Sequence, residues 1–154
     1  MTATLAVGQL APDFTLPSTS GAPITLSALR GQGSVLLAFF PLAFTGTCTS
    51  ELCAFSDDFP QFDQAHAKVF GISVDSIPSL KEFKAKHGIT VDLLSDFKRE
   101  ASRKYDVLLE DKFFSARAYF LIDSKGVLRW KFVEAELGQK RDNAELLAEI
   151  AKIR

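Results

Sequence analysis

Two largely apolar segments place the strongest constraint on the fold. Residues 34–40 read SVLLAFF, and residues 68–75 read KVFGISVD. A strand with one face in solvent would alternate apolar and polar residues, so these segments predict strands that are covered on both faces. The segment between them predicts a helix that begins near residues 45–47 and is disturbed at Pro60. This order of strand, helix and strand predicts a parallel βαβ unit.

The remaining segments also read as helices and strands. They are predicted helices at 77–88, 98–107 and 141–153, predicted strands at 91–96, 116–123 and 127–134, and an N-terminal β-hairpin within 11–29. The order starts with crossover units and ends with a hairpin and a helix. It predicts an α/β domain of three layers around a central mixed sheet, and a thioredoxin-like fold fits that order.

Composition limits the classes of function. The 154 residues are 47% hydrophobic, which is enough for a single domain, 1–154, with its own core. A formal charge of −1 gives no electrostatic argument for binding nucleic acid or an anionic membrane. The start of the chain lacks a signal-peptide pattern, and the longest apolar stretch is about half the roughly 20 residues that a membrane helix needs. We therefore expect a cytoplasmic protein, in which two cysteines seldom form a structural disulfide.

Cys48 stands where its sulfur is expected to be reactive. It lies in the first turn of the predicted helix that follows a central strand. A helix N-terminus offers free N–H groups and a partial positive charge, and both favour a thiolate. Thr45, three residues earlier, can place a hydroxyl beside the sulfur, and Pro41 can shield the sulfur from water.

The spacing of Cys48 and Cys53 limits how they can react. Five residues of helix separate their Cα atoms by about 8.6 Å, whereas a disulfide needs less than about 7 Å. The pair can bond only if the first turns of the helix unwind. From the residues alone, two ordinary buried cysteines remain equally possible. A zinc site is not expected, because His66 and His87 lack the spacing of zinc ligands.

The segment from Pro41 to Cys48 resembles the P-x-x-x-T/S-x-x-C signature of the peroxiredoxins. Four further segments extend the resemblance over nearly the whole chain: GQLAPDFTL, GISVDS, LLSD, and R-x-x-F-x-I-D from Arg117 to Asp123. The resemblance implies a thiol-dependent peroxidase that reduces hydrogen peroxide or organic hydroperoxides. Cys48 would attack the peroxide and become a sulfenic acid, and no metal or organic cofactor is implied.

The resemblance also assigns roles to the residues around this cysteine. Thr45 matches the threonine whose hydroxyl holds the peroxide, and Pro41 matches the shielding proline. Arg117 matches the arginine that reaches the site from a distant strand and stabilises thiolate and peroxide. Glu51 could orient Arg117 or simply face solvent, and Thr47 is a further supporting residue.

Within the family the resemblance is mixed. FFPLAFTG is similar to the alkyl hydroperoxide reductase E type, and CTSELC to the bacterioferritin-comigratory-protein (PrxQ) type. The second type implies that Cys53 resolves Cys48 through an intramolecular disulfide, which thioredoxin or a glutaredoxin-like protein would reduce. Two alternatives are a one-cysteine peroxidase recycled by an external thiol and a non-enzymatic redox sensor. The family allows a monomer or an A-type homodimer.

Several aromatic residues complete the expectations. Tyr119 stands where the family often has threonine. The phenylalanines expected in the core are Phe39, Phe62, Phe70 and Phe120, and those expected on loops around the site, lining a substrate collar or a dimer contact, are Phe44, Phe113 and Phe114.

Overall fold

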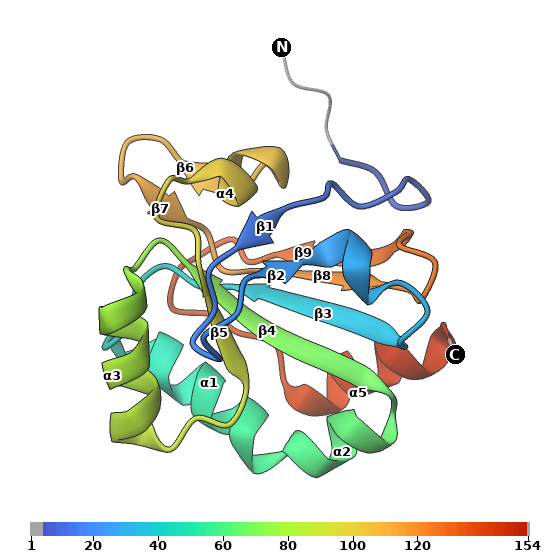
Figure 1. Ribbon diagram of the computed structural model, residues 1–154, viewed down its shortest axis with the longest axis horizontal. Coiled ribbons are helices and arrows are strands. Elements are labelled where there is room, and N and C mark those ends of the chain that lie inside the picture. Colours follow the sequence, from blue (N-terminus) through green and yellow to red (C-terminus); the bar gives the residue numbers. More distant parts are fainter. Residues whose placement is uncertain (1–4, 154) are drawn as a thin grey trace.

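A five-stranded sheet forms the centre of the computed structural model, which describes residues 5–153 (Figure 1). Its strands, in spatial order, are β5 (Asp92–Ser95), β4 (Ala67–Ser73), β3 (Ser34–Phe39), β8 (Ala118–Ile122) and β9 (Leu128–Val133). β3, β4 and β5 run parallel, whereas β8 is antiparallel to both β3 and β9. The sheet is therefore mixed, as the sequence predicts.

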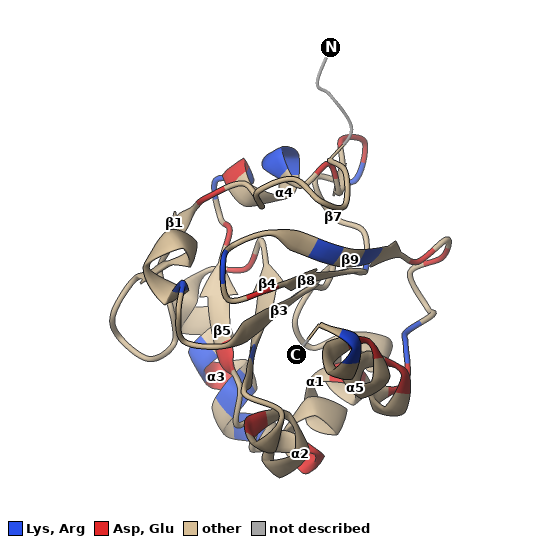
Figure 2. Ribbon diagram, turned by 90° about the vertical axis from the view of Figure 1, so that its right-hand side faces the viewer, with Lys and Arg blue, Asp and Glu red and all other residues tan. Residues whose placement is uncertain are grey.

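Both faces of this sheet are covered, which makes three layers (Figure 2). One face packs against α1 (Gly46–Asp57), α2 (Phe59–Gln64), α3 (Ile77–His87) and α5 (Asn143–Lys152). The other face packs against the N-terminal hairpin of β1 (Thr15–Leu16) and β2 (Ile24–Thr25), the 3-10 helix Leu26–Leu29, and α4 (Glu100–Lys104). The structure thus confirms the predicted thioredoxin-like arrangement with an N-terminal hairpin.

Burial explains the two apolar segments. All six residues of β3 are buried, and their side chains alternate between the two cores on either side of the sheet. The four phenylalanines that we expected in the core are buried as well. At Gly71 of β4 an added Cβ would lie 2.8 Å from Leu93 and 2.9 Å from Leu52, so glycine lets α1 approach the sheet closely.

Three predicted details need correction. Pro60 does not merely disturb α1: it stands in the first turn of a separate helix, α2, after Asp58. The helix predicted over 98–107 is only α4, because Arg99 has a positive φ of 62° and the carboxylate of Asp96 accepts hydrogen bonds from Ala101 N and Ser102 N. The short hairpin of β6 (Leu108–Leu109) and β7 (Phe114–Ser115) was missed, since two-residue strands carry no periodic pattern, and it places Phe114 in a strand rather than a loop.

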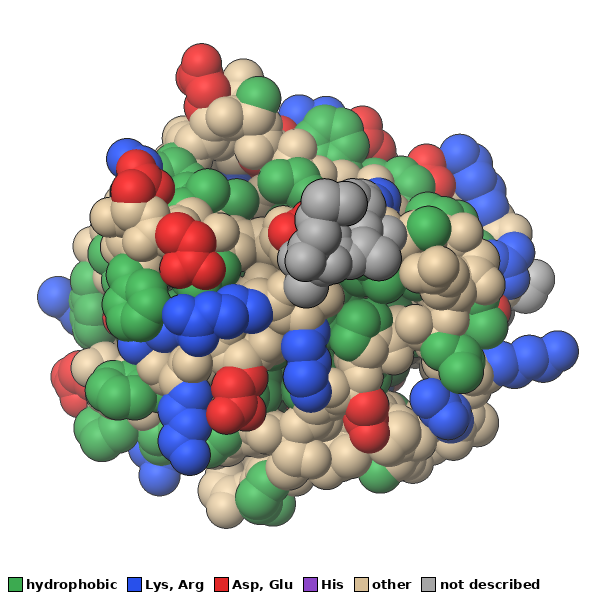
Figure 3. Space-filling model, turned by 90° about the horizontal axis from the view of Figure 1, so that it is seen from above, with side chains coloured by type: hydrophobic (Ala, Val, Ile, Leu, Met, Phe, Trp, Pro, Cys, Tyr) green, Lys and Arg blue, Asp and Glu red, His purple; other side chains and the backbone are tan. Residues whose placement is uncertain are grey.

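The surface and the helices give two further observations. Figure 3 shows acidic and basic side chains interspersed on the face seen from above, without a large area of one sign. Among residues 5–153, no helix is both long enough and apolar enough to cross a membrane.

Candidate active site

The sheet register brings Arg117 beside the start of α1. Phe39, at the end of β3, pairs with Ala118, at the start of β8, so Arg117 lies level with the turn that leads from β3 into α1. α1 begins at Gly46, and Cys48 lies in its first turn, as predicted. Nη2 of Arg117 is 3.0 Å from Sγ of Cys48, and both residues are only 1% exposed. A buried guanidinium in this position can stabilise a thiolate.

Other acceptors hold the guanidinium in place. Nη1 of Arg117 donates to Oε1 of Glu51 at 2.9 Å, and Nε and Nη2 donate to the carbonyl oxygen of Leu137 at 3.3 and 3.2 Å. Burial disfavours the charged guanidinium, but Glu51 and Cys48 outweigh it and raise the pKa of Arg117. The arginine therefore stays charged and has a fixed direction.

Glu51 is a buried residue, not a solvated one. It is 2% exposed, and burial raises the pKa of its carboxyl group above the ordinary value, although Arg117 and Tyr119 partly offset this effect. The hydroxyl of Tyr119 donates to Oε2 of Glu51 at 2.5 Å. Of the two readings of Glu51 from sequence, contact with Arg117 is the one that the structure shows.

The sulfur of Cys48 borders a pocket of about 260 Å³. Its other lining residues include Pro41, Leu42, Thr45, Thr47, Phe114 and Leu137. Since one water molecule takes up about 30 Å³ in the liquid, this space can accept a peroxide that carries a substituent. Thr45 lines the pocket, and its hydroxyl donates to the carbonyl of Leu42 at 2.7 Å.

The loop phenylalanines separate into different environments. Phe114 lines the Cys48 pocket. Phe44 packs edge-on against Phe83 of α3 with ring centroids 5.1 Å apart, and Phe113 lies under the guanidinium of Arg99, 4.2 Å from its Cζ. Phe44 and Phe113 are each 48% exposed.

Sequence reasoning did not single out the residue that holds the loop between β3 and α1. Oδ2 of Asp75, just beyond β4, accepts hydrogen bonds from Ala43 N at 2.8 Å and from Ser73 Oγ at 2.7 Å. Phe44 in this loop has a positive φ of 64°. The GISVDS motif contained Asp75, but only the fold shows that its carboxylate reaches the loop before α1.

Cys53 lies further along α1 and is half-buried. It and Cys48 are both free thiols, and the helix is continuous through both positions. Standard helix geometry separates their Cα atoms by about 8.6 Å, so this conformation has no disulfide between them.

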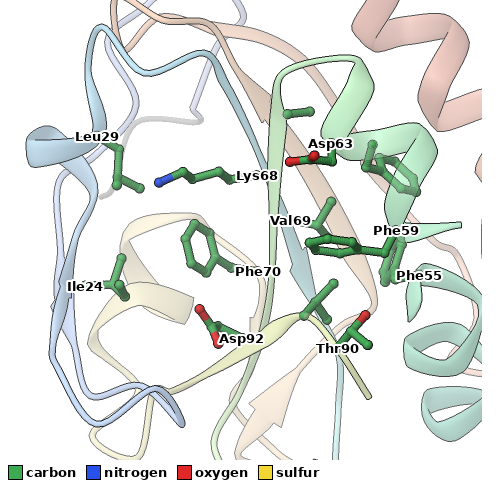
Figure 4. A pocket seen from close by; sticks show the side chains of 13 residues that line it. Ile24, Leu29, Phe55, Phe59, Asp63, Lys68, Val69, Phe70, Thr90 and Asp92 are labelled. Carbon is green, nitrogen blue, oxygen red and sulfur yellow. The ribbon is translucent and has the colours of Figure 1, made fainter. Parts of the chain in front are cut away.

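A second crevice of about 300 Å³ lies at the other end of the sheet (Figure 4). Apolar side chains line it from both layers, among them Ile24, Leu29, Phe55 and Phe59, together with Lys68 and Asp92. None of its lining residues is a cysteine, so thiol chemistry belongs to the Cys48 pocket, not to this larger crevice.

Comparisons with known proteins identify the family. Residues 7–131 match the model of the AhpC/TSA family. Alkyl hydroperoxide reductase E of Mycobacterium tuberculosis is 39% identical over 140 residues, which cover 90% of this chain and 91% of that protein. The putative peroxiredoxin bcp of Coxiella burnetii is 38% identical over 128 residues, covering 79% and 84%.

Solved structures give the same result. Peroxidoxin BcpB from Mycobacterium tuberculosis superposes with a TM-score of 0.85 at 30% identity, over 96% of this chain and 97% of that one. The reduced 2-Cys peroxiredoxin of Plasmodium vivax superposes with a TM-score of 0.87 at 33% identity, over 94% and 80%. The family match spans well over half of the chain. The chain therefore belongs to the AhpC/TSA family and is a peroxiredoxin, an antioxidant enzyme that reduces peroxides with a thiol.

Proposed function

We propose that Cys48 is the peroxidatic cysteine of this peroxidase and that Cys53 resolves it. The thiolate of Cys48 attacks the terminal oxygen of a peroxide, so that an S–O bond forms while the O–O bond breaks. The leaving oxygen takes a proton and departs as water or an alcohol, and Cys48 becomes a sulfenic acid. The 3.0 Å contact between Nη2 of Arg117 and Sγ of Cys48 is the observation that carries this proposal.

The neighbouring residues share the work of the first step. Arg117 stabilises the thiolate and the negative charge that develops on the peroxide oxygens. Thr45 turns its hydroxyl from the Leu42 carbonyl towards the bound peroxide, and Pro41 keeps water from the sulfur. Glu51 orients Arg117, and Thr47 supports the pocket wall beside the cysteine.

The second step needs a conformational change. The thiolate of Cys53 attacks the sulfenic sulfur, an S–S bond forms, and hydroxide leaves and is protonated to water. Because the intact helix keeps the cysteines too far apart, the first turns of α1 unwind before this step. A dithiol donor, thioredoxin or a glutaredoxin-like protein, then reduces the disulfide and restores both thiols.

Mass spectrometry after a single turnover tests this sequence of steps. Reduced protein is mixed with one equivalent of hydrogen peroxide or an alkyl hydroperoxide, and the reaction is followed by the fluorescence of Trp130. Loss of two hydrogens in the product supports a Cys48–Cys53 disulfide. Gain of one oxygen would mean a one-cysteine enzyme recycled by an external thiol. Cys48→Ser is the control and should abolish the reaction.

The proposal also covers the context in which the enzyme works. The 154 residues act as one cytoplasmic domain, as a monomer or as an A-type homodimer. The exposed rings of Phe97 and Phe113 both contact the half-buried guanidinium of Arg99, and Phe113 is next to Phe114 of the pocket wall. This cluster suits such a dimer, since clustered exposed aromatics are typical of interfaces. Light scattering of Phe113→Glu against the wild type tests this contact: a dimer should dissociate.

A further inference from the structure

A single buried hydroxyl connects two parts of the active site. Tyr119 of β8 is fully buried and lies two residues after Arg117, on the same face of the sheet. Its hydroxyl donates to Oε2 of Glu51 at 2.5 Å and accepts a hydrogen bond from the backbone N–H of Arg141 at 3.0 Å. It therefore contacts both the carboxylate on α1 and the segment that follows β9.

The direction of these hydrogen bonds is determined by chemistry. Burial and the charge of Glu51 raise the pKa of Tyr119 well above its ordinary value, so the phenol keeps its proton. An ionised carboxylate can only accept, so Tyr119 must donate to it. Glu51 thus offers one oxygen to Arg117 and the other to Tyr119, and neither oxygen lacks a donor.

The second contact of Tyr119 concerns the wall of the pocket. The segment 134–141 contains Leu137, which lines the Cys48 pocket and whose carbonyl accepts two hydrogen bonds from Arg117. This segment is held at its end by Tyr119 through Arg141 N, and by the ion pair of Arg141 with Glu134 at 2.8 Å. Both acceptors that direct Arg117 are consequently supported by the same hydroxyl.

We propose that Tyr119 is a positioning residue for peroxide reduction, which acts by holding Glu51 and the 134–141 segment so that Arg117 stays directed at Cys48. This inference rests on the proposed role of Arg117. The hydroxyl of Tyr119 bonds to Glu51 and Arg141 N and not to the sulfur, and Tyr119 does not line the pocket, so its effect passes through the groups that it holds. Small errors in the placement of a catalytic group are known to lower rates strongly.

The chain contains a matched control. Tyr105 is its only other tyrosine and is 1% exposed, but it lies in the core on the opposite face of the sheet, where its hydroxyl donates to the carbonyl of Pro12 at 2.7 Å. Tyr119→Phe and Tyr105→Phe each remove one buried hydroxyl and keep the ring. We expect Tyr119→Phe to lower the second-order rate constant for hydrogen peroxide roughly tenfold, and Tyr105→Phe to leave it unchanged, although both destabilise the fold.

A pH profile separates positioning from a general structural effect. The groups that act on Glu51 are Arg117, which directly precedes β8, Tyr119 of β8 and Lys140 from the segment after β9. The Tyr119 hydrogen bond lowers the pKa of Glu51, so its removal should raise that pKa further. The rate constant is divided by the fraction of thiolate, which is measured by ultraviolet absorbance. As the pH is lowered, this rate constant per thiolate should begin to fall at a higher pH in Tyr119→Phe than in the wild type, because Glu51 is protonated earlier.

Glu51→Gln completes the experiment. The glutamine cannot titrate, so the rate constant per thiolate of this variant should be low and independent of pH. Adding Tyr119→Phe to it should lower that rate constant by a smaller factor than in the wild type, because only the support of the 134–141 segment is then left to lose. A Tyr119→Phe protein with the wild-type rate and profile, or full additivity with Glu51→Gln, would overturn the inference. A wild-type protein that fails to reduce peroxide would instead overturn the proposed function, so the two failures are distinguishable.

Discussion

A substitution at Ser50 can change how readily α1 unwinds without altering the residues that contact Cys48 or Cys53. Ser50 is exposed and lies on α1 between Cys48 and Cys53. If the disulfide forms only after the first turns unwind, Ser50→Gly should speed its formation and Ser50→Ala should slow it. Both substitutions leave the pocket and its contacts in place, because Ser50 does not line the pocket.

The size of the effect follows from helix propensity. Glycine is about 1 kcal/mol less favourable than alanine in a helix interior, and serine lies between them. Unwinding also breaks the bond from Thr49 N to Thr45 O at 2.9 Å and the contact of Cys48 with Arg117, but these losses are the same in both variants. The two variants should therefore differ by roughly fivefold in the population of the unwound helix and in the rate of disulfide formation.

The assay is a rapid-quench experiment on reduced protein. One equivalent of peroxide is added, a thiol-blocking reagent stops the reaction at set times, and mass spectrometry separates sulfenic acid from disulfide. The first step should have the same rate in both variants, and Ser50→Ala should be the more readily overoxidised at high peroxide, since its sulfenic acid persists longer. Ala148→Gly is the control, because it introduces glycine at an exposed position of α5, a helix that contains neither cysteine. It should leave the rate of disulfide formation unchanged.

Equal rates of disulfide formation in Ser50→Gly and Ser50→Ala would refute the reasoning. That result would mean that unwinding is not needed before Cys53 reacts, or that another step limits the rate. A difference that also occurred in Ala148→Gly would show a general loss of stability and not a local opening of α1.

Further predictions concern the site and the core. Arg117→Ala should slow the reaction with peroxide by roughly a hundredfold, as measured by stopped flow, because a fixed donor to the developing charge is lost. Cys53→Ser should still form a sulfenic acid on Cys48 once, yet lose turnover with thioredoxin; unchanged turnover would remove Cys53 from the mechanism. Gly71→Ala should lower the free energy of unfolding in urea by about 1–3 kcal/mol, since its Cβ would meet Leu93 at 2.8 Å, whereas Gly138→Ala meets nothing within 4 Å and should have little effect.

The parts of the fold that could be predicted are those with strong local patterns. β3 and most of β4 are buried on both faces, so their sequences are largely apolar. α3 has a proline in its first turn and is followed by Gly88 in a left-handed conformation. These signals depend on neighbours in sequence. β6 and β7 are strands of two residues each, and α4 is a helix of only five residues. Elements this short contain too few residues to show a hydrophobic period in the sequence.

The site divides in the same way. Cys48, Thr45 and Pro41 share one segment, and a motif identifies them together. The contact of Glu51 with Arg117 joins residues 66 positions apart, and Tyr119 OH meets Arg141 N over 22 positions. Neither secondary-structure propensity nor hydrophobic periodicity can show that the hydroxyl of Tyr119 faces the carboxylate of Glu51. This contact depends on the register between β3 and β8 and on the path of the chain after β9.

The start of α1 shows why these distant contacts matter for the mechanism. Thr45 forms no side-chain cap, the first turn has no acidic residue, and Gly46 opens the helix, whereas Ser76 caps α3 by accepting a hydrogen bond from Ser79 N at 3.4 Å. The local sequence thus gives α1 a weak N-terminus. In the mechanism that we propose, peroxide reduction requires this turn to be folded against Arg117, and disulfide formation requires it to open. The contacts of Arg117 with Cys48 and Glu51 favour the closed turn, and conversion of the thiolate into a neutral sulfenic acid removes the charge that Arg117 attracts. The first reaction would in this way weaken the contact that opposes the second.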